Sequence, residues 1–314
     1  MDYHDTIPVI TLSRAKSIMR SAVGLAREAA DSDSDSRLQT REKLVPGVLQ
    51  PGGSGVVLTD NVEAAYGRKG VALSLGPYGA TMSPSTEYSA VYDNQHSTFE
   101  ALEDFHLERL QVFTEDPNTW ADVDYIAFET FGRVDEIRVA RQVITEVFAQ
   151  GAEKKEWWIS CVFPDTAEEG CLPTGESVDD AVEAMVEIGV GHDGHELERP
   201  WGIGINCTKV SKLRNLLVKF ETAVKILLND DEEWPALVLY PDGTKKGEYY
   251  DTTLKEWVVD GNAPEATLGE KAWYEELGDI VEETRNRAPW RAVVVGGCCR
   301  TGPAEIEGLR RCLH

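Results

Sequence analysis

Three of the six cysteines in this chain stand where two predicted strands end. The valine-rich run 292–295 stops at two glycines, and Cys298 and Cys299 follow directly. Neighbouring cysteines make a poor disulfide with each other, because their Cβ vectors diverge along an extended backbone. Taken alone, the pair is equally typical of two small buried side chains. A second apolar run, 202–205, leads to Cys207, and this third cysteine favours a joint role.

The thiols of Cys207, Cys298 and Cys299 match the ligand set expected for a catalytic zinc ion. Structural zinc sites fill all four positions, whereas three protein ligands leave one position for a substrate. A zinc ion with three thiolates is electron-rich, so it activates water poorly but can hold an incoming thiol as a thiolate.

The remaining metal-binding residue types give weaker signals. Cys161 lies within a predicted strand and is interpreted as a small buried residue, whereas Cys171 and Cys312 lie in a loop and in the tail. His192 and His195 have a spacing that could bind a metal ion. A solvated loop is favoured for them, because no further ligand is adjacent.

The composition excludes several classes of protein. The net charge of −24 over 314 residues argues against binding to nucleic acids or anionic membranes, for which a basic patch supplies most of the attraction. The amino terminus is polar and acidic, and no apolar run reaches membrane-spanning length. Six cysteines in such a chain point to reduced thiols or metal ligands more than to disulfides. We therefore expect a cytoplasmic protein.

The elements that must position these cysteines alternate along the chain. Six strands separated by five helices predict parallel βαβ units with right-handed crossovers. The strands are apolar throughout, as expected when both faces of a sheet are covered. The predicted strands are 71–75, 125–128, 157–162, 202–205, 236–239 and 292–295, and the predicted helices are 98–113, 134–150, 178–188, 210–228 and 272–281, after an amphipathic helix at 13–30.

This alternation fits either an open doubly wound sheet or a closed eight-stranded α/β barrel. A dinucleotide-binding sheet needs a glycine-rich turn after its first strand, but Gly52, Gly53 and Gly55 precede an apolar run. In a barrel, chemistry gathers from the carboxyl ends of several strands. The cysteines are placed in that way, so the barrel is favoured.

The strand ends together resemble one known family. The motifs at 204–208 and 295–301 are similar to those of the homocysteine S-methyltransferase family. Matches in the same order are Gly76-Pro77-Tyr78-Gly79-Ala80, Glu87-Tyr88, Phe105-His106, Glu129-Thr130 and Tyr240-Pro241. The resemblance covers roughly residues 13 to 312. It implies a zinc-dependent (β/α)8 TIM-type barrel that methylates homocysteine to methionine, with S-methylmethionine or S-adenosylmethionine as the sulfonium donor.

The resemblance also implies roles for individual residues. The three cysteines match the zinc ligands, and the substrate sulfur would take the fourth position. Glu129 matches the carboxylate that holds the substrate ammonium, with a helix-capping or ion-paired glutamate as the alternative. Asn206 would orient the cysteine turn beside the substrate. Tyr78 would line the donor pocket, with simple packing of its aromatic ring as the alternative. Folate- or cobalamin-dependent methyltransferases are disfavoured, because they need modules for which this chain has no room.

The amino-terminal part departs from the family pattern. The family has a first strand ending in Asp-Gly-Gly and a second strand before the helix that 13–30 matches. Residues 1–12 are too short for both, since a βαβ unit takes about 30 residues or more. We therefore predict one domain over 1–314, a barrel lacking its first strand and most of its second, with a long loop insertion at 31–69.

A barrel without these strands has exposed edges, which natural proteins avoid. A truncated start, a degenerate paralogue and a rearranged start remain as explanations, and truncation is favoured because all three zinc ligands are present. An inactive zinc-binding paralogue is the alternative function. The sequence does not reveal the methyl donor or the oligomeric state.

Overall fold

The computed structural model describes residues 10–35, 55–58, 69–192, 194–229, 231–244, 247–251, 256–259 and 271–313. Its centre is a seven-stranded sheet in the order β1-β9-β6-β5-β4-β3-β2. Six strands run parallel, and β1 pairs antiparallel with β9. The strands are β1 (Gly55–Leu58), β2 (Ala72–Leu75), β3 (Tyr125–Phe131), β4 (Glu156–Cys161), β5 (Gly202–Lys209), β6 (Ala236–Asp242) and β9 (Val293–Gly296).

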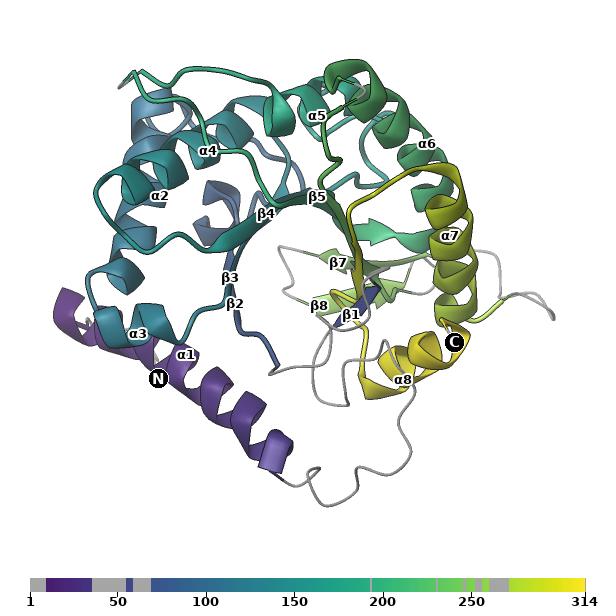
Figure 1. Ribbon diagram of the computed structural model, residues 1–314, viewed down its shortest axis with the longest axis horizontal. Helices are drawn as coiled ribbons and strands as arrows, with labels where there is room; N and C mark the ends of the chain where they lie inside the picture. Colours follow the sequence, from purple (N-terminus) through teal and green to yellow (C-terminus); the bar gives the residue numbers. More distant parts are fainter. Residues whose placement is uncertain are drawn as a thin grey trace, which may run out of the picture.

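Helices cover the outer side of this curved sheet (Figure 1). They are α1 (Leu12–Asp35), α2 (Phe99–Thr114), α3 (Pro117–Ala121), α4 (Val134–Ala149), α5 (Val178–Val186), α6 (Val210–Leu227), α7 (Trp273–Arg287) and α8 (Pro303–Cys312). A separate hairpin of β7 (Glu248–Asp251) and β8 (Glu256–Val259) follows β6. None of the described helices is long and apolar enough to cross a membrane.

The six parallel strands are neighbours in chain order, as in the wall of a (β/α) barrel. Side chains on the outer face of the sheet, such as Ile126 and Phe128 of β3, are completely buried in one core with Ile137 of α4. All six predicted strands and the five helices between them are confirmed, with shifts of a few residues at their ends. The barrel-type α/β fold predicted from the sequence is therefore confirmed.

The segment 31–69 differs from the predicted loop. Helix α1 continues through the Asp/Ser run to Asp35, where Asp31 lies 3.9 Å from the guanidinium of Arg27 one turn earlier. Strand β1 then pairs with β9, so that edge of the sheet is covered by an antiparallel strand. The rest of the segment, 36–54 and 59–68, lies outside the described residues.

Strand β2 is not apolar on both faces as predicted. Leu73 and Leu75 are buried against the helices, whereas Ala72 and Ser74 on the opposite face are exposed. The cause is its position, because β2 pairs only with β3 and ends the sheet. Within the described residues β1 and β2 are the two edges, and they do not pair with each other.

Candidate active site

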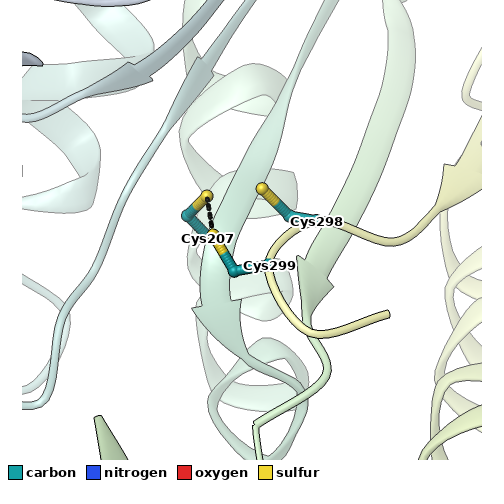
Figure 2. A group of neighbouring side chains, drawn as sticks. All are labelled: Cys207, Cys298 and Cys299. Carbon is teal, nitrogen blue, oxygen red and sulfur yellow. Dashed lines mark hydrogen bonds between the residues drawn. The ribbon is translucent and has the colours of Figure 1, made fainter. Parts of the chain in front are cut away.

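The thiols of Cys207, Cys298 and Cys299 converge at the carboxyl ends of β5 and β9 (Figure 2). All three Sγ atoms lie within 4.8 Å of one another, and those of Cys207 and Cys299 are 3.9 Å apart. No other group of three or more His, Cys, Asp or Glu side chains in the described part of the chain is arranged to hold a metal ion. The predicted grouping of the three cysteines is therefore present.

The backbone holds this arrangement in an unusual conformation. Cys207 has a φ of 47° within β5, where the register with β6 shifts. Cys298 donates its N–H to the carbonyl of Pro241 at 3.0 Å, so the cysteine loop is tied to β6. A Cβ atom on Gly297 would lie 2.3 Å from the Thr301 hydroxyl, so only glycine fits before the pair. Left-handed backbone at a non-glycine residue is costly and is typical of functional sites.

The cysteine cluster fits a tetrahedral zinc ion. Zn–S bonds of about 2.3 Å place two sulfur ligands about 3.8 Å apart. The 3.9 Å between Cys207 and Cys299 matches this spacing. Three soft sulfur donors also suit zinc far better than magnesium or calcium.

The charges on the three thiols are linked by their mutual contacts. Hydrogen bonds from Cys207 and Cys298 lower the pKa of Cys299. Hydrogen bonds with Cys298 and Cys299, together with burial, raise the pKa of Cys207. The contacts therefore couple the protonation of the three thiols to one another. Such a set binds a divalent cation with release of the remaining protons.

Glu129 lies near the end of β3 and faces the same region. Its carboxylate accepts hydrogen bonds from the hydroxyls of Ser74 and Tyr240. Burial raises the pKa of Glu129, while these two hydrogen bonds lower it. No described lysine or arginine lies within ion-pairing distance of it, so the ion-paired alternative is not observed.

Asn206 is completely buried and joins the ends of β5 and β3. Its Oδ1 accepts from the backbone N–H of Thr130, and its Nδ2 donates to the hydroxyl of Thr130, both at 2.8 Å. Thr130 has a φ of 64° and lies 3.9 Å from the Sγ of Cys207. Asn206 therefore holds the turn that follows Glu129 in place beside Cys207, the next residue after Asn206 in the chain.

Two neighbouring residues without a predicted role lie on the segment that reaches the cysteine cluster. The hydroxyl of Tyr88 lies 3.8 Å from the Sγ of Cys299. Burial, with smaller contributions from Cys299 and Glu129, raises the pKa of Glu87 to about 7. The Glu87-Tyr88 pair was visible in the sequence as a family match, but a match in a loop does not show which way its side chains point.

Tyr78 belongs to a group of aromatic side chains near the loop that carries Glu87 and Tyr88. Its ring stacks on His96, with centroids 4.9 Å apart, and meets Tyr92 and Phe105 edge to face. Its role in a donor pocket stays a prediction.

The weaker metal-ligand candidates lie apart from the cluster. Cys161 is completely buried at the end of β4, as expected for a packing residue. Cys171 and Cys312 are free thiols elsewhere. His192 is largely exposed and faces Glu103 at 3.5 Å.

Comparisons with known proteins agree with this geometry. A family model described as homocysteine S-methyltransferase matches residues 4–313. "Homocysteine S-methyltransferase 1" of Arabidopsis thaliana is 27% identical over 314 residues, covering 98% of this chain and 76% of the relative. "Selenocysteine Se-methyltransferase" of Brassica oleracea var. italica is 28% identical over 241 residues, covering 77% and 56%. The metallated form of the homocysteine methyltransferase MmuM from Escherichia coli has a TM-score of 0.57 at 21% identity, covering 96% and 72%.

Proposed function

This chain belongs to the homocysteine S-methyltransferase family, and we propose that it transfers a methyl group from a sulfonium donor to the thiol of homocysteine, with zinc bound by Cys207, Cys298 and Cys299. The observation that carries the proposal is the convergence of three sulfurs, all within 4.8 Å of one another, at two strand ends. When bound, zinc supplies the positive charge that keeps a substrate thiol ionised at neutral pH. The donor is S-methylmethionine or S-adenosylmethionine.

The reaction requires little acid–base chemistry from the chain. The homocysteine thiolate attacks the methyl carbon as the methyl–sulfonium bond breaks. The donor sulfur keeps the bonding pair and becomes a neutral thioether, and the thiol proton leaves to solvent. The protein must therefore bind two substrates that each carry an amino-acid ammonium group, and align two sulfur atoms with one carbon.

The residues around the cluster suit these tasks. Glu129, held only by neutral hydroxyls, is available to bind the ammonium of homocysteine. Asn206 orients the turn that carries Cys207 and the turn after Glu129. We also propose that Tyr78 lines the pocket that binds the methyl donor.

Metal analysis together with a methyl-transfer assay tests the proposal. We expect purified protein to carry one zinc per chain and to form methionine from homocysteine with at least one of the two donors. Cys298→Ser should lose the zinc, and its rate should fall by at least about 100-fold, since even residues that only support metal ligands cost 10- to 100-fold.

The matched control is Cys312→Ser, which removes an exposed thiol of α8 outside the cluster. It should keep both zinc and activity. Zinc retained in full by Cys298→Ser would contradict the ligand assignment. Bound zinc with no methyl transfer from either donor would favour an inactive zinc-binding paralogue instead.

A further inference from the structure

The segment that carries Glu87 and Tyr88 to the cysteines, residues 76–92, lies between β2 and α2. Its regular structure is a single 3-10 turn, Tyr78–Thr81. It nevertheless brings the Tyr88 hydroxyl to 3.8 Å from the Sγ of Cys299. Because neither a sheet nor a long helix holds this segment, its position depends on side chains of the neighbouring helices.

The main anchor is Glu136, in the first turn of α4, whose side chain is fully buried. Its carboxylate accepts the backbone N–H of Tyr78 at 2.7 Å and the hydroxyl of Tyr92 at 2.6 Å. It also contacts Nε2 of His106 on α2 at 2.9 Å. One carboxylate thus joins both ends of the segment to two helices.

Two arginines add a second pair of contacts at the same two ends. Arg109 on α2 donates to the carbonyl of Gly76 at 2.6 Å. Arg133, before α4, donates to the carbonyl of Ala90 at 3.3 Å and lies 4.7 Å over the ring of Tyr92. Both ends are therefore fixed by charged groups, and the middle of the segment faces the cysteine cluster.

A carboxylate in such a place is costly to keep. Burying one costs several kcal/mol unless its lone pairs are satisfied, and apolar side chains of similar volume often stabilise a core equally well. Glu136 cannot be replaced by an apolar side chain without leaving the Tyr78 amide and the Tyr92 hydroxyl unpaired. The network gives the segment one defined position, which a merely apolar contact would not impose.

The middle of the segment brings a second acidic side chain, Glu87, to the side of the sheet that carries Glu129. Glu87 lies close enough to Glu129 and Cys299 for their charges to raise its pKa further, beyond the main effect of burial. No described lysine or arginine is within ion-pairing distance of Glu87 or Glu129. A cation placed beside these two acidic side chains favours their ionised forms, and a sulfonium donor is such a cation.

We propose that Glu136 is a positioning residue for methyl transfer: by fixing residues 76–92 it holds Glu87 and Tyr88 beside the cysteine cluster, where they bind the cationic sulfonium donor. This inference rests on the proposed function. It assigns Glu136 no contact with either substrate and no part in zinc binding.

The test uses Glu136→Gln in the zinc-loaded full chain. Glutamine keeps the shape but replaces one acceptor oxygen by a donor, so the segment loses one of its ties. We expect kcat/KM for the donor to fall about 10- to 100-fold, the range that small misplacements of reacting groups produce. The fall should come mainly from the donor KM, with zinc content and homocysteine KM unchanged.

Arg141→Gln is the matched control. Arg141 is another fully buried charge on α4, but it donates to the carbonyls of Ala184, Glu187 and Glu198, away from the segment. Its loss should lower the Tm at least as much as Glu136→Gln while leaving the donor KM unchanged. Glu136→Asp, which keeps the charge on a shorter stem, should recover part of the donor affinity.

Calorimetric titration of the zinc-loaded protein with each donor, without homocysteine, separates the two proposals. Wild-type protein that binds neither donor and forms no methionine contradicts the proposed function itself. Wild-type protein that binds a donor no more tightly than Glu136→Gln overturns only the positioning role. An equal rise of donor KM in Arg141→Gln would also overturn it, because the effect would then be general destabilisation.

Discussion

Strand β3 has a carboxylate at each end, and the two are held in opposite ways. Asp124, just before the strand, accepts from the guanidinium of Arg27 on α1 and from the backbone N–H of Val71 at 2.7 Å. Glu129, near the carboxyl end, accepts only from the hydroxyls of Ser74 and Tyr240. The first carboxylate is neutralised by the protein, and the second is not.

The difference extends to the backbone. Three of the four non-glycine residues with positive φ in the described chain follow or lie at the carboxyl ends of strands, namely Thr130, Cys207 and Arg300. At the amino end, Arg27 joins α1 to the loops before β2 and β3 through the carbonyls of Lys69 and Asp122. The contacts at the amino end of the sheet therefore stabilise the fold. The carboxyl end instead holds backbone strain and an unneutralised carboxylate, as is typical of a ligand-binding site.

Replacing Glu129 or Asp124 by its amide should give the largest difference between the two ends, in homocysteine binding and in the free energy of unfolding. Glu129→Gln should weaken homocysteine binding about 10- to 100-fold, since a charge-assisted hydrogen bond contributes about 1.5–3 kcal/mol. Its free energy of unfolding should change by less than about 1 kcal/mol, because no protein cation loses a partner.

Asp124→Asn should do the reverse. It removes the nearest of the three carboxylates around the nearly buried guanidinium of Arg27 and leaves only Asp31 and Asp122, each 3.9 Å away, which should lower the free energy of unfolding by about 1–3 kcal/mol. The homocysteine KM should stay at the wild-type value. Urea unfolding and steady-state kinetics of both variants measure the contrast, and an equal loss of stability in the two would break it.

The sequence predicted one half of this comparison well. Glu129, Asn206 and the three cysteines stand at the ends of long apolar runs, and parallel strands bring such ends to one side of a sheet. The alternation of strands and helices therefore predicted that the cysteines lie together, and the family resemblance supplied the expected role of Glu129, which stays a prediction.

The features that the sequence did not predict depend on contacts between distant segments of the chain. Glu136 is part of an ordinary amphipathic helix pattern, and nothing in that pattern shows that its carboxylate meets Tyr78 and Tyr92 more than 40 residues earlier. Strand β1 was missed because only four residues pair, between glycines and polar residues. These residues form a strand only because they pair with β9, which comes more than 230 residues later in the chain.

The pH dependence of stability sharpens the comparison. Burial raises the pKa of Glu87 to about 7, above its unfolded value of 4.5, so between these values the folded protein holds a proton that the unfolded chain has lost. Stability should therefore fall as the pH rises through this window. Glu87→Gln removes the titrating group, so its Tm should fall less than that of the wild type between pH 5 and 7.5.

Thermal unfolding of both proteins in the same buffers measures this. Asp124→Asn is a useful comparison, because it retains Glu87 and its Tm should therefore fall with rising pH as in the wild type. Parallel Tm curves for the wild type and Glu87→Gln would show that Glu87 titrates normally, and therefore that its carboxyl group is less buried than the structure indicates.

The smallest effect is expected from Ser74→Ala, which removes one of the hydroxyls that support Glu129. The hydrogen bond from Ser74 lowers the pKa of Glu129, so its loss should raise that pKa further. Because only the ionised carboxylate attracts an ammonium, the homocysteine KM should rise about 3- to 10-fold, the worth of one ordinary hydrogen bond. The rise on acidification should begin at a higher pH than in the wild type.

Thr222→Ala is the control, since that hydroxyl bonds only within the exposed face of α6. It should leave the KM profile unchanged. A Ser74→Ala profile that overlays the wild type at every pH would mean that Glu129 does not hold the ammonium through its charge. The two ends of β3 would then differ in stability alone, and the carboxylate that binds homocysteine would have to be sought at Glu87, which shares the same end of the sheet.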